Sequence, residues 1–477
     1  MLREIKDKNV TVIGLARSGI GAANLLAELG GRVTVTDTKT EEELKESIPK
    51  LDPSVRLALG SHPEDIFLHA DTLIVSPGVP LDIRPLFLAK SKGIPILGEL
   101  ELAYQVIRSQ KSEAGSQIGF LAVTGTNGKS TTTALLDFMM KKGGFRTILG
   151  GNIGNAVTEE ISKMITSHES RVTSHDYIVV EVSSFQLESI TDFRPKVAAI
   201  VNITPDHLDR YRSIEEYGAA KARIFENQTA NDFLVLNLDD PETMKVKSEK
   251  LRIKSEKPKL FYFSRKQEVE GIYSKNGIVY CNIQGLPLTP CSSPLIKVEE
   301  IKIKGVHNLE NAMAASAMAL LAGCPVEAVI DSLKEFAGLE HRLEFVRELD
   351  GVSYYNDSKG TNVDAVLKSL ESFSSPVILI AGGRDKEGDF SRLRDLVQAR
   401  VKVLILIGEA SEKIKKAVGD VTDVALAKDL GDAVNSSRNR AIQGDTVLLS
   451  PACASFDMFT NFEHRGRQFK KIVMEMN

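Results

Sequence analysis

The chain has 477 residues, a length at which soluble proteins usually contain about three domains. Hydrophobic residues make up 42% and charged residues 26%, an ordinary globular composition that argues against extensive disorder. With 60 Lys and Arg residues against 64 Asp and Glu residues, the formal net charge is −4, so the chain lacks the basic surplus typical of nucleic-acid-binding proteins.

Cysteine spacing and hydropathy exclude further kinds of site and further cellular locations. None of the four cysteines forms a Cys-x-x-Cys pair, which argues against a zinc site or a redox dithiol. The charged residues 1–8 do not resemble a signal peptide, and the most apolar run, residues 312–323, is too short to span a bilayer. We therefore expect a cytoplasmic protein with no membrane insertion and no nucleic-acid partner.

Short apolar strands alternate with helical stretches from the start of the chain. Four strands are expected at Val10–Ile13, Arg32–Thr36, Leu73–Val75 and Ile94–Leu97. A helix is expected over Ala22–Leu29, between the first two strands. This βαβ rhythm is typical of a parallel sheet covered by helices. It predicts a Rossmann-like N-terminal domain over residues 1–98.

A second series of strands is expected at Gly119–Val123, Tyr177–Val182 and Val197–Val201. Continuous apolar runs of this kind favour buried parallel strands. Short strands and turns between Leu260 and Ile303 predict a small antiparallel insert, and an Ala-rich helix is expected over Asn308–Leu321. Together these elements predict a central domain of the P-loop ATPase type over residues 99–338.

A third βα series begins near Phe345, with strands expected at Val377–Ala381, Val403–Ile407 and Thr446–Leu449. It predicts a Rossmann-like C-terminal domain over residues 339–477. The expected fold class of the whole chain is therefore α/β with three domains, whose boundaries lie near Gly98 and Gly338.

The strongest local signal is a glycine-rich loop, Gly125-Thr126-Asn127-Gly128-Lys129-Ser130-Thr131, between a strand and a helix predicted over Thr131–Lys142. Backbone N–H groups of such a loop surround phosphates, and the helix N-terminus adds positive potential. Lys129 would neutralise phosphate charge, and the Ser130 hydroxyl would bind Mg²⁺. Val123 replaces the first glycine of the usual pattern, but strand, loop and helix together still favour nucleotide binding over an ordinary turn.

Three further polar residues follow strands of the central domain. Glu181 ends an apolar strand, where a carboxylate can bind Mg²⁺ but also form an ordinary salt bridge. His207 follows the next strand as a candidate metal ligand or proton carrier, although a lone histidine is more often neither. Lys221 lies on a helix predicted over Ser213–Asn227, where the ordinary interpretation is an exposed surface lysine.

The first domain contains a glycine pattern that imitates a dinucleotide site. Gly14, Gly19 and Gly21 follow a strand, and Asp37 follows the next one, as in nicotinamide-binding domains. The glycines are separated by five and two positions, whereas the fingerprint requires two and three. We therefore do not expect a nicotinamide cofactor.

The motifs resemble, in residue type and order, those of the Mur ligase family. The first matching motifs along the chain are the phosphate loop, residues 181–187, residues 202–209 and Lys221. The order continues with Gly305–Asn311, Glu340–Glu344, Asn356–Thr361 and Gly382–Lys386. Residues 450–466 are similar to a segment of the D-glutamate-adding members, and the Asp-Asn-Pro-Arg tetrapeptide of diaminopimelate-adding members is absent. The resemblance thus covers nearly the whole chain.

The resemblance implies an ATP-dependent ligase that adds D-glutamate to UDP-N-acetylmuramoyl-L-alanine through an acyl phosphate, in peptidoglycan precursor synthesis. The three domains would bind the UDP-sugar, ATP and the amino acid, in a chain expected to be a monomer. Two alternatives remain open. One is another Mur-type or folylpolyglutamate-type ligase with a different amino-acid acceptor, and the other is a nucleotide-binding regulator that has lost catalysis.

The resemblance also implies roles for individual residues. ATP would be bound by the phosphate loop together with Asn308, Asn311, Arg342 and Asp357. One Mg²⁺ would be held by Ser130 and Glu181, and a second by His207 and a carbamylated Lys221, with Asn152 near the reacting groups. The UDP-sugar would contact Arg17, Ser18, Asp37, Thr38, Ser76 and Gly78. D-Glutamate would be held by Lys359, Thr361, Lys386, Ser455 and Phe462.

Overall fold

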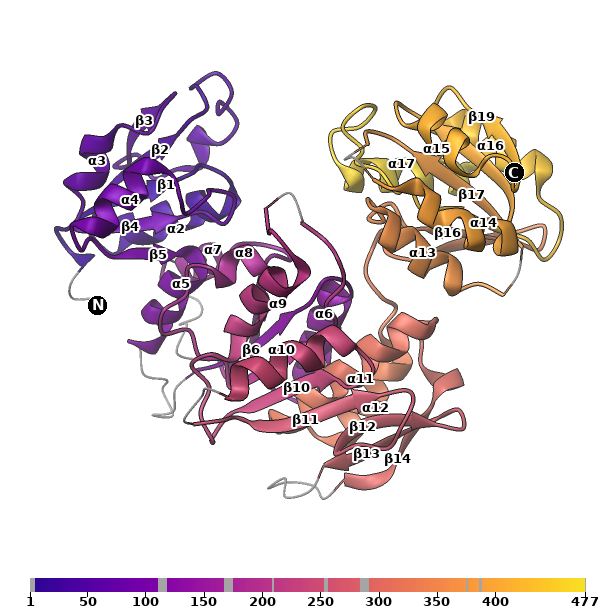
Figure 1. Cartoon of the computed structure of the whole chain (residues 1–477), viewed down its shortest axis with the longest axis horizontal. Helices are drawn as coiled ribbons and strands as arrows, with labels where there is room; N and C mark the ends of the chain where they lie inside the picture. The colour runs from indigo at the N-terminus through magenta and orange to yellow at the C-terminus, as the bar shows by residue number, and fades with distance from the viewer. Residues whose placement is uncertain are drawn as a thin grey trace. The chain divides into compact units, whose positions relative to one another are not determined.

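The structure is a computed structural model that describes residues 5–109, 118–166, 175–207, 210–252, 256–283, 291–374, 376–385 and 388–476. The chain divides into two compact units. The first contains Met1–Glu300 and Glu310–Lys334, and the second contains Ile301–Leu309 and Glu335–Asn477. Both units contain largely parallel sheets with helices packed against them, so the predicted α/β class is confirmed (Figure 1).

The first unit begins with a five-stranded parallel sheet in the order β3-β2-β1-β4-β5. Its strands are β1 (Asn9–Ile13), β2 (Arg32–Asp37), β3 (Arg56–Leu59), β4 (Thr72–Val75) and β5 (Ile96–Gly98). Its helices are α2 (Arg17–Glu28), α3 (Glu64–Leu68), α4 (Arg84–Ser91) and α5 (Glu99–Arg108). The edge strand β3 is absent from the sequence prediction because its side chains are exposed or half-buried and form no buried apolar run.

The second sheet of this unit has nine strands in the order β14-β13-β12-β11-β10-β9-β6-β8-β7. The strands are β6 (Gly119–Thr124), β7 (Thr147–Gly151), β8 (Tyr177–Glu181), β9 (Val197–Ile200), β10 (Phe233–Asn237), β11 (Lys259–Ser264), β12 (Gly271–Lys275), β13 (Ile278–Ile283) and β14 (Cys291–Lys297). Strand β6, which leads into the phosphate loop, lies between β8 and β9. The polar residues that follow β8 and β9 therefore lie next to the loop.

The expected antiparallel insert is smaller than predicted and is not separate from the sheet. Strand β11 is parallel to β10, and β12 is parallel to β11. Only β12, β13 and β14 form an antiparallel meander, which extends one edge of the nine-stranded sheet. The sequence could not distinguish the two arrangements because short strands of either kind have the same apolar pattern.

Helices flank the nine-stranded sheet. They are α6 (Lys129–Lys142), α7 (Val157–Thr166), α8 (Ser184–Leu187), α9 (Ile214–Ala222), α10 (Pro241–Arg252), α11 (Val306–Leu321) and α12 (Val326–Glu335). Helix α9 ends earlier than predicted, and a short 3₁₀ turn, Arg223–Phe225, follows it. No helix among the described residues is both long and apolar enough to cross a membrane.

Two buried carboxylates at the start of α5 bind the two sheets of the first unit together. Glu101 is fully buried, and its oxygens accept hydrogen bonds from the backbone N–H groups of Thr191, Asp192 and Phe193. Glu99 is also buried and accepts from both the backbone N–H and the hydroxyl of Thr158 at 2.8 Å. Since buried polar groups are costly when unpaired, these contacts fix the junction between the sheets.

The second unit contains a six-stranded sheet in the order β15-β16-β20-β17-β18-β19. Its strands are β15 (Glu344–Leu349), β16 (Val352–Asn356), β17 (Val377–Gly382), β18 (Val401–Ile407), β19 (Asp423–Leu426) and β20 (Thr446–Leu449). Only β15 is antiparallel to its neighbour. Helices α13 (Val363–Glu371), α14 (Arg394–Arg400), α15 (Ser411–Val418), α16 (Leu430–Arg440) and α17 (Phe462–Glu475) complete it, and separate apolar clusters fill the two faces.

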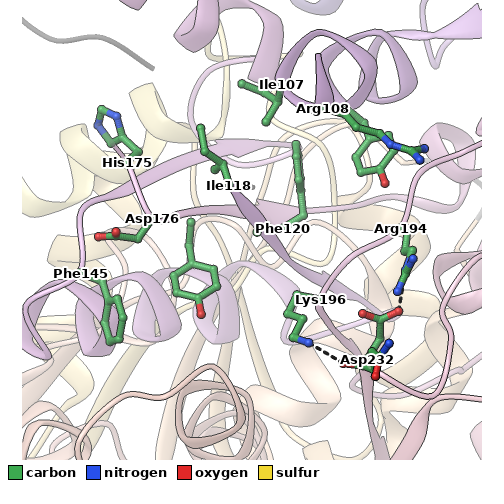
Figure 2. Close-up of a pocket in the computed structure, with 14 residues that line it drawn as sticks. Ile107, Arg108, Ile118, Phe120, Phe145, His175, Asp176, Arg194, Lys196 and Asp232 are labelled. Carbon is green, nitrogen blue, oxygen red and sulfur yellow. Dashed lines mark hydrogen bonds and ion pairs between the residues drawn. The ribbon is translucent and has the colours of Figure 1, made fainter. Parts of the chain in front are cut away.

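The amino-terminal ends of β6, β8 and β9 border a cavity of about 490 Å³ (Figure 2). Two of its cations are already engaged, since Arg194 pairs with Asp232 at 2.7 Å and Lys196 donates to the backbone oxygen of Asn231. The phosphate loop follows the carboxyl-terminal end of β6. This cavity and the predicted nucleotide site therefore lie at opposite ends of the same strands.

Candidate active site

The phosphate loop, residues 125–131, joins β6 directly to the N-terminus of α6. Gly128 has φ +85°, a left-handed conformation that favours glycine, and a Cβ there would clash with the Asn311 side chain. Asn311 is 4% exposed, and its Oδ1 accepts a hydrogen bond from Thr132 Oγ1 at 3.2 Å. The structure thus places one predicted ATP-binding asparagine against the first turn of α6.

Asn202, which follows β9, holds the loop in shape. Its Oδ1 accepts from the backbone N–H of Asn127 at 2.9 Å, and its Nδ2 donates to the backbone oxygen of Asn127 at 3.0 Å. Its own backbone oxygen accepts from the N–H of Thr126 at 2.9 Å. No role was predicted for Asn202. The available signal was an asparagine at the end of an apolar strand, but the adjacency of β9 and β6 was needed to interpret it.

Two lysines converge on one backbone oxygen of the loop. Lys129 Nζ donates to the oxygens of Gly125 and Thr126 at 3.0 and 2.9 Å. Lys221 Nζ, from α9, donates to the same Gly125 oxygen at 2.8 Å. Two lysine side chains therefore lie beside the backbone that would surround a phosphate.

The interpretation of Lys221 as a surface lysine is wrong. The residue is 1% exposed, and its Nζ lies 4.3 Å from the centre of the Tyr217 ring. Burial, and secondarily the charge of Lys129, holds the pKa of Lys221 well below its usual value. Burial therefore makes the neutral amine more accessible here than at an exposed lysine.

The two candidate ligands of the first metal lie on neighbouring elements, Glu181 at the end of β8 and Ser130 in the first turn of α6. Glu181 is paired in register with Val123 of β6 and is 2% exposed, and Ser130 is 3% exposed at the start of α6. Asn152 donates from Nδ2 to Glu181 Oε1 at 3.0 Å, and its backbone N–H donates to the Glu181 backbone oxygen at 2.9 Å. A carboxylate and a hydroxyl are hard oxygen ligands of the type that Mg²⁺ prefers.

His207 and Lys221 both lie beside the ring of Tyr217. Its backbone has φ +54°, an uncommon conformation for a residue other than glycine, and its side chain is 45% exposed. The His207 ring is 6.2 Å from that of Tyr217, which also contacts Lys221. The next two residues of the motif, 208 and 209, lie outside the described residues.

A cavity of about 520 Å³ at the carboxyl-terminal ends of the first sheet, here called the first-domain cavity, is lined by all six predicted UDP-sugar residues. These are Arg17, Ser18, Asp37, Thr38, Ser76 and Gly78. Gly151 and Asn152 of the central domain also line it, and Arg17 donates to the backbone oxygen of Gly154. The cavity therefore extends from the first sheet to the amide that contacts Glu181.

The glycine pattern of the first domain has a packing explanation. Gly14 has φ +91°, and a Cβ on Gly19 would clash with the Gly14 backbone oxygen. Ser76 Oγ donates to this same oxygen at 3.0 Å. Asp37 accepts from the backbone N–H groups of Leu15 and Lys39 at 2.7 and 2.9 Å. Glycines and carboxylate together order the loops around the cavity.

Asp357, in the second unit, was predicted to bind ATP. Its side chain faces the interior of its own unit. It is 4% exposed, and its Oδ2 accepts from the hydroxyls of Ser369 and Ser450 at 2.6 and 2.7 Å. Burial raises the pKa of Asp357. The adjacent Arg342 contributes an electrostatic interaction with this carboxylate. In this structure Asp357 therefore anchors the loop after β16.

That loop carries two predicted D-glutamate residues, Lys359 and Thr361. Lys359 Nζ lies 5.6 Å from the centre of the Phe462 ring, and Ser455 is 2% exposed. Arg465 lies in the 450–466 segment but was not among the predicted D-glutamate residues. It is 1% exposed and donates to Ser358 Oγ at 3.0 Å and to the Ser358 backbone oxygen at 2.8 Å. Burial lowers its pKa to about 10. The predicted residue Lys386 lies outside the described residues.

A cluster of Glu340, His341 and Glu344 in the same unit has the composition of a metal site. The Lys470 ammonium, however, pairs with Glu340 and Glu344 at 2.9 and 2.5 Å. His341 Nδ1 accepts from the side-chain amide of Asn356 at 2.8 Å. The cluster is therefore better explained as support for the strand that precedes Asp357.

The fold and the phosphate loop define a nucleotide-binding α/β protein, and comparisons with known proteins give its family. Residues 8–98 match the Mur ligase MurD-like N-terminal domain, residues 123–319 the Mur ligase middle domain, and residues 341–453 the Mur ligase glutamate ligase domain. The chain belongs to the Mur ligase family, as its motifs predicted.

Individual relatives cover the chain almost completely. It is 46% identical over 476 residues to the UDP-N-acetylmuramoylalanine–D-glutamate ligase of Geotalea uraniireducens, covering 99% of each chain. It is 47% identical over 472 residues to the enzyme of the same name from Citrifermentans bemidjiense, covering 98% of each. The structure of the UDP-N-acetylmuramate–alanine ligase MurC of Thermotoga maritima has the same fold, with a TM-score of 0.58 at 18% identity, covering 98% of this chain and 99% of that one.

We predict that Asn202→Ala lowers the rate of ATP-dependent phosphate release about 100-fold, because misplaced loop amides no longer align the phosphates. The Asn127 backbone groups also lose their partners, so the free energy of unfolding should fall by about 2 kcal/mol. The exposed Asn231, at the opposite edge of the sheet, provides the control Asn231→Ala, which should behave like the wild type. Wild-type turnover by a folded Asn202→Ala variant would contradict this role.

Proposed function

We propose that this chain is an ATP-dependent ligase that joins D-glutamate to UDP-N-acetylmuramoyl-L-alanine, releasing ADP and phosphate, in the synthesis of peptidoglycan precursors. The similarity to ligases of this name along 98–99% of the chain carries the proposal. The first step of such a reaction needs a site for ATP and a site for the UDP-sugar. The phosphate loop and the adjoining first-domain cavity are suited to these two roles.

A carboxylate is a poor electrophile, because an oxide would have to leave. In the first step, an oxygen of the substrate carboxylate attacks the γ-phosphorus of ATP, and the bond to the β-γ bridging oxygen breaks. This step gives an acyl phosphate and ADP. Two anions must approach each other, so stabilisation of negative charge is the main requirement of catalysis.

The central domain meets this requirement with cations and backbone amides. Lys129 and the N-terminus of α6 stabilise the negative charge of the transferred phosphoryl group. Asn202 fixes the loop, and Asn152 orients Glu181. Ser130 and Glu181 would hold Mg²⁺, which when bound neutralises charge on the β- and γ-phosphates.

In the second step, the free amine of D-glutamate attacks the acyl carbon, and phosphate leaves as the amide forms. D-Glutamate carries two carboxylates, which need cationic and hydroxyl partners. Lys359, Lys386, Thr361 and Ser455 have suitable chemistry, and Phe462 supplies an apolar wall. Arg465 maintains the loop that bears Lys359.

A second metal would be held by His207 and by Lys221 in carbamylated form. An ammonium cannot ligate a cation, whereas a carbamate supplies anionic oxygens. Carbamylation requires a neutral amine, and the lowered pKa of Lys221 favours that form. The carbamate of Lys221 would place a negative charge beside the positive charge of Lys129. We expect the enzyme to act as a cytoplasmic monomer.

We predict that D-glutamate is the preferred acceptor when phosphate release is measured with ATP, UDP-N-acetylmuramoyl-L-alanine and a panel of amino acids. L-Glutamate, L-alanine, L-lysine and diaminopimelate should each give rates lower by at least about 100-fold, because a site built for one set of polar groups leaves others unpaired. Preference for L-lysine or diaminopimelate would contradict the assignment of D-glutamate as the acceptor but would leave the assignment as a ligase intact. Absence of phosphate release with every acceptor would instead favour a regulator.

We predict that Lys221→Ala lowers product formation by at least about 100-fold, since a group that stabilises transferred charge is lost. Wild-type activity should also fall after exhaustive removal of carbon dioxide and return with bicarbonate. Lys196→Ala is the matched control, because Lys196 lies at the opposite edge of the same sheet and binds a backbone oxygen. Full activity of Lys221→Ala, or indifference of the wild type to bicarbonate, would rule out the carbamate.

A further inference from the structure

His62, for which no role was predicted, lines the first-domain cavity. It follows β3, and its half-buried ring packs edge-on against Phe67 with centroids 5.9 Å apart. Its Nδ1 lies 3.1 Å from Thr36 Oγ1, and Thr36 is fully buried in β2. One edge of the imidazole is thus fixed from within the domain, while the ring borders the cavity.

The hydrogen bonds around Thr36 determine which nitrogen of His62 carries the proton. Thr36 Oγ1 lies 3.0 Å from the backbone oxygen of Ser61, which can only accept. A hydroxyl has a single proton, so both hydrogen bonds form only if Thr36 donates to Ser61 and accepts from His62 Nδ1. The neutral imidazole then carries its proton on Nδ1, and Nε2 is an acceptor.

The other nitrogen remains available to a ligand. The described residues provide no hydrogen-bond partner for Nε2 of His62. Burial lowers the pKa of His62, and the carboxylate of Asp37 opposes this shift only in part. The ring is therefore neutral near pH 7, so that the first-domain cavity contains a fixed hydrogen-bond acceptor at its β3 end.

The strand order indicates which part of a nucleotide would reach that end. The cavity residues at or just after the carboxyl-terminal ends of β3, β2 and β1 are, in this spatial order, His62, Asp37 and Arg17. The N-terminus of α2, next to Arg17, suits the diphosphate. The acyl end must extend toward Asn152, because Asn152 contacts Glu181 beside the phosphate loop. The base is then left at the opposite end, near His62.

We propose that His62 selects a uracil base by accepting a hydrogen bond from its N3–H at Nε2. The proposal rests on the proposed function, which makes the substrate a uridine nucleotide. Uracil has a donor at N3, whereas cytosine has a lone pair there. Two acceptors facing each other cannot bond, so the same fixed tautomer that binds uracil rejects cytosine. Thr36 acts as a positioning residue that maintains the tautomer.

The test is calorimetric titration of the full chain with UMP and with CMP. The wild type should bind UMP at least about tenfold more tightly, the size of one well-placed hydrogen bond together with an unpaired group. His62→Ala should weaken UMP binding about tenfold without weakening CMP binding, because the group that rejects cytosine is removed together with the acceptor for uracil. His69→Ala, which changes a histidine bound to the Asp65 backbone oxygen outside the cavity, is the matched control and should keep the wild-type preference.

Thr36→Val provides a second, nearly isosteric variant. It leaves the His62 ring in place but removes the group that fixes its tautomer, so the UMP-to-CMP preference should fall several-fold. Loss of UMP and CMP binding to the same extent in His62→Ala, or an unchanged preference in both variants, would overturn the proposal while leaving the ligase assignment intact. Failure of the wild type to bind UMP would overturn both.

Discussion

The backbone oxygen of Gly125 accepts hydrogen bonds from two lysines, and much of the site's chemistry depends on this contact. The two Nζ atoms lie 3.0 and 2.8 Å from this oxygen. Two ammonium groups that share one acceptor would repel each other by several kcal/mol, since two like charges about 4 Å apart repel by about 4 kcal/mol at an effective dielectric constant of 20. The site can relieve this repulsion by binding phosphate between the lysines, or by removing the charge of Lys221. Both solutions suit an enzyme that transfers a phosphoryl group.

The contact exists because the sheet brings distant segments to one edge. Strand β6 lies between β8 and β9, so Glu181 and Asn202 reach the loop from opposite sides. The chain segment after β7 brings Asn152 to Glu181, and Asn152 also borders the first-domain cavity. Helix α9 supplies Lys221. A carboxylate substrate that extends along the cavity would therefore meet the γ-phosphate without a further binding site.

Sequence reasoning succeeded where the signal was local. The phosphate loop lies between a strand and a helix as predicted, Glu181 ends the predicted strand β8, and the motif order gave the family. The burial of Lys221 and the role of Asn202 depend on neighbours about 96 and 75 positions away, which no local pattern reveals. The hydrogen bonds from Ser369 and Ser450 to Asp357 likewise join distant segments, and its expected contact with ATP stays a prediction. The antiparallel meander was misjudged because short strands have similar patterns whichever way they pair.

The most direct test of the account is the fate of oxygen from the substrate carboxylate. UDP-N-acetylmuramoyl-L-alanine labelled with ¹⁸O in both carboxylate oxygens would be turned over with ATP and D-glutamate, and the phosphate and nucleotide products analysed by mass spectrometry. Attack on the γ-phosphorus predicts one ¹⁸O in each inorganic phosphate released, one in the new amide and none in ADP. Unlabelled phosphate, or label in AMP, would contradict the acyl phosphate and the placement of the carboxylate beside the phosphate loop.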